Sequence, residues 1–129
     1  MSGRITAVPG ASDVFIGAVV AYDNVVKSGM LDVPPELLET HGAVSEAVVR
    51  AMAEGVQRQF AVDAAIAVTG IAGPTGGTPE KPVGTVWLAA RYGSETRTLK
   101  RIFPGDRGEI RARAAQAALD LLRRLLAGL

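Results

Sequence analysis

The chain has 129 residues, the length of one domain with a hydrophobic core of its own. Its 14 Lys and Arg residues and 13 Asp and Glu residues leave a formal charge of +1, with no long run of either sign, so the charge pattern does not indicate a nucleic-acid or membrane partner. Cysteine is absent, which excludes a disulfide framework and a thiol nucleophile, and the single histidine, His41, argues against a Ser-His-Asp triad. No apolar stretch reaches the roughly 18 residues of a membrane span. We therefore expect a globular, cytoplasmic protein.

The first half of the chain predicts one strand and two helices. Val14–Tyr22 (VFIGAVVAY) is almost uninterruptedly apolar and rich in β-branched residues, which is typical of a strand covered on both faces. Gly17 within it indicates a bulge or a bend. A short helix is expected over Pro35–Thr40, with proline tolerated in its first turn. Ser45 is a suitable N-cap for a longer helix, Glu46–Phe60, whose apolar residues recur about once per helical turn.

The second half predicts three strands and a final helix. Ala61–Val68 alternates poorly and is expected to be a buried strand, and Val83–Arg91 and Glu95–Ile102 are expected to form a hairpin. The last helix begins at Asp106, where a glutamate in the capping-box position follows, and runs to about Leu126. This order of elements predicts an α/β fold: a single layered domain with a mixed sheet and helices packed on it.

The stretch Thr69–Thr85, TGIAGPTGGTPEKPVGT, joins two of the predicted strands and holds five glycines and three prolines. Glycine lets backbone approach a ligand closely, and proline stiffens the loop. A loop of this length and rigidity between buried strands is usually functional, although a long ordered hairpin is the alternative. The Glu80-Lys81 pair within it is either a lid or ligand contact or an ordinary surface pair.

The composition restricts hydrolytic chemistry to serine, threonine, lysine, tyrosine and carboxylates. A serine is a weak nucleophile unless a nearby base takes its proton, and a lysine can be that base if burial lowers its pKa. Ser12 follows a Pro-Gly turn, Tyr22 ends the first predicted strand, and Lys27 follows five residues later. Taken alone, each residue also fits a plain role: an N-cap, a rim aromatic and a solvated charge.

The glycine-rich stretch closely resembles the signature of the CinA C-terminal domain family, the nicotinamide-nucleotide amidohydrolases. Three other stretches follow in family order over nearly the whole chain: PGAS…VVAYDNVVK (Pro9–Lys27), HGAVSE (His41–Glu46) and FPGDR (Phe103–Arg107). The resemblance implies a layered α/β domain. It also implies hydrolysis of nicotinamide mononucleotide to nicotinate mononucleotide and ammonia, in pyridine nucleotide recycling, without a metal or an organic cofactor.

The same resemblance implies roles for individual residues. Ser12 corresponds to the family's nucleophile, and Tyr22 and Lys27 correspond to the residues that handle its proton. Thr69 and Gly70 would line the substrate site together with the arginine of FPGDR.

The substrate-binding roles are physically reasonable. Thr69 and Gly70 stand where a predicted strand gives way to a loop, and backbone N–H groups of a glycine-rich turn can bind a phosphate or an oxyanion. Arg107 lies in the first turn of the last helix, whose positive end also favours anions, and an arginine there suits a nucleotide phosphate. The alternative for Arg107 is a solvated residue at a helix start.

Chain length constrains the proposed catalytic group. If residues 12 to 22 are fully extended, Ser12 and Tyr22 lie about 33 Å apart at roughly 3.3 Å per residue and cannot share one site within a chain. Either a helical turn after Ser12 and a bend near Gly17 bring them together, or a second subunit completes the site. On this ground we expect a homodimer.

One part of the family pattern is absent. Family members carry, upstream of the first matched stretch, a strand and an ESxTGG-like turn that leads into a helix, and MSGRITAVPG would begin inside that helix, about 30 residues late. We therefore expect a single CinA C-terminal-like domain over residues 1–129, truncated at its N-terminus relative to the family. The alternative function is a catalytically silent nucleotide-binding or interaction module of a competence/damage-inducible CinA-like protein. Direct nucleic-acid binding is not expected, because the arginines of the last helix form a solvated face.

Overall fold

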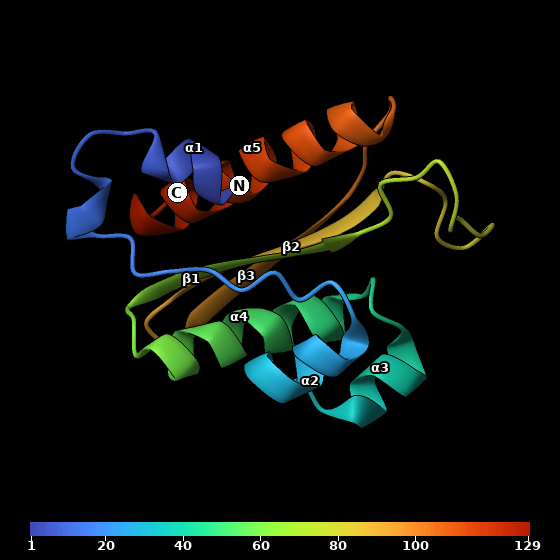
Figure 1. The fold of residues 1–129 in the computed structure, drawn as a ribbon, viewed down its shortest axis with the longest axis horizontal. Helices are drawn as coiled ribbons and strands as arrows, with labels where there is room; N and C mark the ends of the chain where they lie inside the picture. The colour runs from blue at the N-terminus through green and yellow to red at the C-terminus, as the bar shows by residue number, and fades with distance from the viewer.

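A computed structural model describes the whole chain of 129 residues. Its centre is a three-stranded antiparallel sheet in the order β1 (Ala64–Gly70), β2 (Thr85–Tyr92), β3 (Glu95–Ile102). Helix α5 (Arg107–Leu126) covers one face of the sheet, and helix α4 (Glu46–Phe60) covers the other (Figure 1). The α/β class predicted from the sequence is therefore confirmed.

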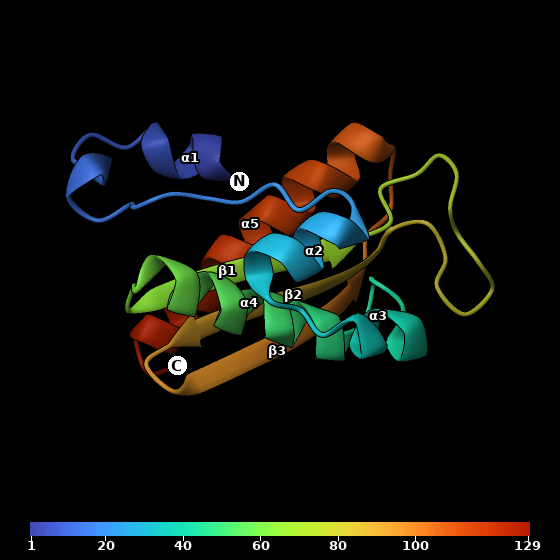
Figure 2. The same cartoon turned by 60° about the horizontal axis from the view of Figure 1, so that its bottom comes forward.

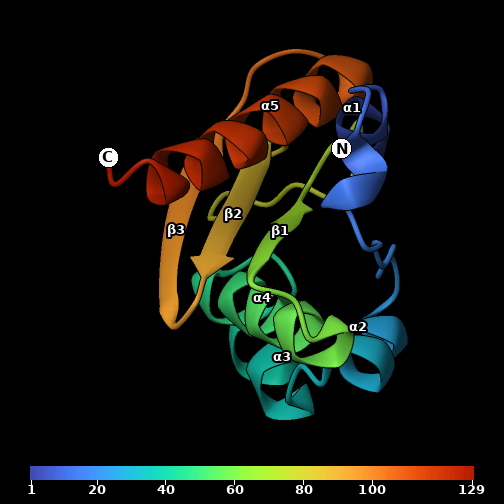
Figure 3. The same cartoon turned by 90° about the vertical axis from the view of Figure 1, so that its left-hand side faces the viewer.

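Smaller helices extend both helical layers. They are α1 (Ser2–Thr6), the 3-10 turn η1 (Ala11–Asp13), α2 (Asn24–Leu31) and α3 (Pro35–His41). Helix α1 lies beside α5, where Arg4 donates a hydrogen bond of 2.8 Å to Gln116, and α2 and α3 pack against α4 (Figure 3). Helix α2 was not predicted, although its N-cap is recognisable: the Asp23 carboxylate accepts from the Val25 N–H at 2.9 Å. No helix has both the length and the apolarity to cross a bilayer.

Two hydrophobic clusters fill the spaces between the layers. On the α4 side, the small side chains of Ala67 and Ala89 let the helix approach the sheet closely, so that Val48 and Val49 are fully buried. On the α5 side, Leu88 and its neighbours on β2 pack against a stripe of the helix. Strand β2 contributes side chains to both clusters, because successive residues of a strand point to opposite faces of the sheet.

The predicted helix starts are confirmed. The Ser45 hydroxyl accepts from the Val48 N–H at 3.3 Å, and Asp106 and Glu109 form a reciprocal capping box. The strand boundaries shift by a few residues: β1 begins at Ala64 rather than at residue 61, whereas β3 matches its predicted range.

The sheet differs from the expected mixed sheet in one respect. All of its pairings are antiparallel, β1 with β2 and β2 with β3. The N-terminal apolar run, which was predicted to be a strand, is not part of this sheet, since no backbone hydrogen bond joins it to β1.

The prediction of a doubly covered strand over Val14–Tyr22 is wrong. The segment is extended, but it carries no strand pairing, and only its inner side chains pack on the α4 layer. Gly17 marks neither a bulge nor a sharp bend; a Cβ there would lie 3.1 Å from the Phe60 ring, so the glycine permits close packing on α4. The outer side chains are exposed, among them Val14 and Val20. The apolar run therefore has one covered face and one open face.

Candidate active site

The glycine-rich loop extends beyond the sheet at the end of β1 (Figure 1). Since β1 and β2 are antiparallel neighbours, the loop is a hairpin connection. Two side chains hold it in place, Arg107 from α5 and Lys81 from within the loop. Arg107 donates from Nη1 to the Gly73 carbonyl at 2.9 Å, and Lys81 donates from Nζ to the His41 carbonyl at 2.6 Å. The Glu80-Lys81 pair is thus more than a surface pair, because Lys81 ties the loop to the C-terminal end of α3.

Tyr22, Arg107 and the loop meet at one place. Arg107 is the first residue of α5, and its Nη2 donates to the Tyr22 hydroxyl oxygen at 3.4 Å while Nη1 holds Gly73. Tyr22 is 82% exposed, so its hydroxyl is open to solvent and to a ligand. Arg107 is exposed, as the solvated alternative expects, but its guanidinium also bridges two segments distant in the sequence.

Lys27 is buried directly behind Tyr22. Its side chain is 6% exposed, and Nζ donates to the carbonyl of Ala21 at 2.8 Å and to that of Tyr22 at 3.4 Å. Burial lowers the pKa of Lys27 because the charged form loses hydration, and the negative charge of Asp23 raises it in partial compensation. Lys27 is therefore no solvated charge: it releases its proton more readily than an exposed lysine, as a general base requires.

Thr69 and Gly70 face opposite layers. Thr69 is buried on the α4 side, where its hydroxyl donates to the Ala43 carbonyl at 2.9 Å and fixes the segment that precedes α4. Gly70 lines a largely apolar pocket of about 220 Å³ on the α5 side, with Val68 and Ile110 among its walls. The Thr69 hydroxyl is therefore already engaged in a structural hydrogen bond.

Ser12 lies apart from the other two predicted catalytic residues. It sits in η1, and the extended segment Val14–Tyr22 separates it from α2, so that the two helical turns lie at opposite ends of that segment (Figure 2). Eight steps of roughly 3.3 Å make this separation about 26 Å. Ser12 lies within a helical turn, but no bend at Gly17 returns the chain. Within one chain Tyr22 therefore contacts Lys27 through its carbonyl and Arg107 through its hydroxyl, whereas Ser12 lies apart.

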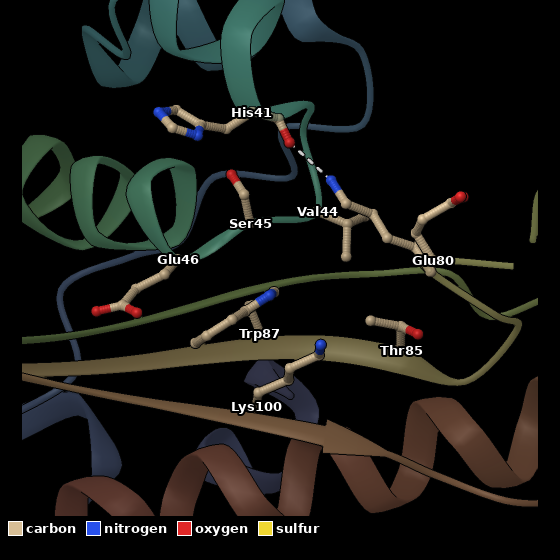
Figure 4. Close-up of a pocket in the computed structure, with 9 residues that line it drawn as sticks. His41, Val44, Ser45, Glu46, Glu80, Thr85, Trp87 and Lys100 are labelled. Carbon is tan, nitrogen blue, oxygen red and sulfur yellow. Dashed lines mark hydrogen bonds between the residues drawn. The ribbon is translucent and has the colours of Figure 1, made fainter. Parts of the chain in front are cut away.

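A second hollow lies on the α4 side of the same loop (Figure 4). It has a volume of about 290 Å³ and includes none of the predicted catalytic and substrate-binding residues, but Glu80 and Lys81, the candidate lid pair, line it. Its floor is the cross-strand pair Trp87 and Lys100, with Nζ 6.0 Å from the ring centroid, and its rim includes His41 and Glu46. Sequence reasoning missed this pair, although the register of the predicted hairpin places the two residues opposite each other.

The fold and the site together define an α/β domain built around a glycine-rich hairpin loop, and comparison with known proteins identifies its family. The model of the CinA C-terminal domain matches residues 1–126. A CinA-like protein of Gemmatimonas aurantiaca is 56% identical over 124 residues, which are 96% of this chain and 29% of that protein. One of Mycobacterium avium is 53% identical over 133 residues, which are 98% of this chain and 30% of that protein. The chain belongs to the CinA C-terminal domain family and spans about three-tenths of the length of these curated relatives.

Solved structures agree with this assignment. The competence damage-inducible protein A of Klebsiella pneumoniae superposes with a TM-score of 0.93 at 36% identity, over 98% of this chain and 78% of that one. The competence/damage inducible protein CihA of Agrobacterium tumefaciens has the same TM-score at 40% identity, over 96% of this chain and 76% of that one.

Proposed function

We propose that this protein hydrolyses the carboxamide of nicotinamide mononucleotide, forming nicotinate mononucleotide and ammonia and so recycling pyridine nucleotide. The observation that carries the proposal is the buried Lys27, whose lowered pKa and contact with the Tyr22 main chain suit a proton acceptor. Tyr22 connects that acceptor to groups that suit a nucleotide, because its carbonyl accepts from Lys27 and its hydroxyl accepts from Arg107, which in turn holds Gly73 of the loop. The resemblance of the loop to the family's amidohydrolase signature supplies the reaction.

The proposed reaction needs one nucleophile and one base. One chain holds Ser12 far from Lys27, so the proposed reaction requires that a second copy supplies the serine. The Ser12 hydroxyl of that copy attacks the carboxamide carbon while its proton passes to the Lys27 amine, directly or through the Tyr22 hydroxyl. Collapse of the tetrahedral intermediate breaks the C–N bond, and the leaving nitrogen takes the proton and departs as ammonia. Water that gives its proton to the same amine then attacks the acyl ester, which releases the nicotinate carboxylate and restores Ser12.

The phosphate of the substrate is assigned to Arg107. This guanidinium stands at the N-terminal end of α5, where the helix dipole also favours an anion. Its present partners are a carbonyl and a hydroxyl, which are neutral acceptors, so a phosphate would be its first ionic partner here. Phosphate binding would then help to hold the carboxamide against the nucleophile.

The test is ammonia release from nicotinamide mononucleotide by the chain and by Ser12→Ala. Ser94→Ala, in the exposed turn between β2 and β3, is the matched control. We expect turnover by the chain and by the control and none by Ser12→Ala. Equal turnover by Ser12→Ala would contradict the assignment of the nucleophile.

The separation of Ser12 from Lys27 within one chain favours a second candidate, a catalytically silent nucleotide-binding or interaction module. Such a module would bind nicotinamide mononucleotide through Arg107 and release no ammonia. Calorimetric binding without turnover supports this candidate, and turnover refutes it.

A further inference from the structure

We infer that the hollow on the α4 side of the glycine-rich loop is a second small-molecule site, and that it binds a monocyclic aromatic carboxylate. The inference does not rest on the proposed function, because none of the residues assigned to that reaction lines this hollow. It rests on the fixed walls of the hollow, on the donors that stay free inside it and on the apolar surface beside them.

Hydrogen bonds hold the walls of the hollow in place. On the loop side, the Lys81 ammonium donates to the His41 carbonyl at 2.6 Å, which ties the loop to the end of α3. On the α4 side, the Ser45 hydroxyl donates to the Gly42 carbonyl at 2.8 Å and caps the helix. A pocket that is already formed needs little ordering when a ligand binds. Its volume of about 290 Å³ suits a molecule of one ring rather than a nucleotide.

Two donors in the hollow have no acceptor within the chain. They are the Lys100 ammonium and the indole N–H of Trp87, and every buried side-chain nitrogen does have a partner, so this N–H is open to solvent. The two residues are cross-strand partners, which places both side chains on the same face of the sheet. In Figure 4 both nitrogen atoms are directed toward Thr85. Two neighbouring donors, one of them charged, suit the two oxygens of a carboxylate.

The acidic groups around the hollow do not neutralise its cations. The Glu46 carboxylate already has an ion pair with Arg50 at 3.4 Å. Glu80 is exposed on the rim and forms no ion pair, so solvent screens its repulsion of an anion. Lys81 keeps two N–H groups beyond its bond to a carbonyl, and that carbonyl leaves its charge unpaired. Lys81 and Lys100 together therefore favour an anionic ligand.

The apolar surface of the hollow provides a place for a ring. Val44 and Trp87 are its two hydrophobic residues, and Trp87 is half-buried because it also packs against the core cluster on the α4 side. This packing fixes the indole, so that a ligand meets a rigid aromatic surface. Lys100 Nζ is 6.0 Å from the ring centroid, at the outer limit of a cation–π contact, so the ammonium can turn to a ligand at little cost.

Tryptophan fluorescence tests the site directly, because Trp87 is the only tryptophan of the chain. The probe is benzoate, and the two matched controls are benzamide, which has the ring without the charge, and cyclohexanecarboxylate, which has the charge without the aromatic ring. We expect a saturable change with benzoate and at least about 10-fold weaker binding of benzamide, which lacks the charge-assisted contact. Cyclohexanecarboxylate should also bind more weakly. No saturable change with benzoate, or equal binding of either control, would overturn the inference.

Charge variants test the sign of the ligand and the place where it binds. Lys100→Met should weaken benzoate binding about 10-fold, and Glu80→Gln should strengthen it about two- to fivefold, since only a screened repulsion is removed. The control is Arg101→Met, which neighbours Lys100 but lies on the α5 face of the sheet and should bind benzoate as wild type does. All three side chains are exposed, so folding is not at risk. Unchanged binding by Lys100→Met, or weaker binding by Glu80→Gln, would refute an anion site in this hollow.

Competition separates this site from the proposed reaction. In the Ser12→Ala variant, which should not consume nicotinamide mononucleotide, we expect the Kd of benzoate to be the same with and without that nucleotide. Displacement of benzoate would show that the hollow belongs to the substrate site and would overturn a second site. Benzoate binding by a wild-type chain that releases no ammonia would refute the proposed function and support the inference.

Discussion

Replacing Lys27 by methionine removes the proposed base at nearly constant side-chain volume. Loss of a general base lowers kcat by about 10²–10⁴, or about 3–5 kcal/mol of transition-state stabilisation. The effect on the free energy of unfolding is smaller, because two contributions oppose each other. The substitution removes the hydrogen bond from Nζ to the Ala21 carbonyl (2.8 Å), which costs about 1.5–3 kcal/mol. It also removes the cost of burying a charge. Activity should therefore fall far more than stability.

Lys27→Arg makes this prediction sharper. Arginine keeps the positive donor but does not lose its proton, so the structural contact can remain while the base is absent. The assay is kcat for ammonia release, with Arg124→Met, an exposed basic residue of α5, as control. We expect Lys27→Arg and Lys27→Met to be almost equally inactive and Arg124→Met to be active. Near wild-type turnover by Lys27→Arg would refute the role of base.

The pH dependence of stability follows from the same residue. Burial lowers the pKa of Lys27 from 10.5, so between the folded and the unfolded pKa the unfolded chain binds more protons. Stability then rises with pH in that window, because the penalty for burying the charged form is fully present below the folded pKa and is gone only above the unfolded pKa. We expect the urea midpoint of wild type to rise relative to that of Lys27→Met as pH approaches 10.5. A constant difference between the two proteins would show that the pKa of Lys27 is not lowered.

Three other changes probe the substrate site and the packing. Arg107→Ala should raise KM for nicotinamide mononucleotide about 10- to 100-fold, because a charge-assisted hydrogen bond to the phosphate is lost. KM for the phosphate-free riboside should stay nearly unchanged. Equal effects on both substrates would show that Arg107 does not bind the phosphate. Gly55→Ala places a Cβ on the Leu31 carbonyl oxygen and should cost about 1–3 kcal/mol in urea unfolding, whereas Gly29→Ala, with open space around it, should not destabilise. Asp106→Ala removes the cap of α5 and should cost about 1 kcal/mol, measured as a lower melting temperature.

Local signals predicted the helices and the hairpin well. Ser45 and Asp106 are caps whose hydrogen bonds join residues three apart, so the sequence contains the whole interaction. The β2–β3 hairpin likewise depends on a short turn between neighbouring strands. Helix α2 (Asn24–Leu31) was not predicted, because it directly follows an apolar run whose composition favours a strand. Asp23, a residue type common at N-caps, is the local feature that predicts the start of this helix.

The candidate site was predictable only in part. The motifs selected Tyr22, Lys27 and Arg107, and in the structure Tyr22 contacts both of the others. That Thr69 is engaged with Ala43, and that Lys81 anchors the loop to His41, depends on contacts between residues 26 and 40 positions apart. Such contacts are set by how the layers pack, and no local pattern encodes them.

Composition and periodicity were enough to predict an α/β domain and the position of the glycine-rich loop, because both depend on residue types and on spacing along the chain. The family followed from the resemblance of four sequence motifs, and the match of the family model over residues 1–126 shows it. The environment of Val14–Tyr22 was not accessible in this way. The sequence of an apolar run is the same whether one or both of its faces are buried. How many faces are buried depends on which helices and strands pack against it in the folded protein. The burial of Lys27 has the same origin: its pKa is lowered by neighbours that fold around it, and in the unfolded chain the same side chain is an ordinary solvated lysine.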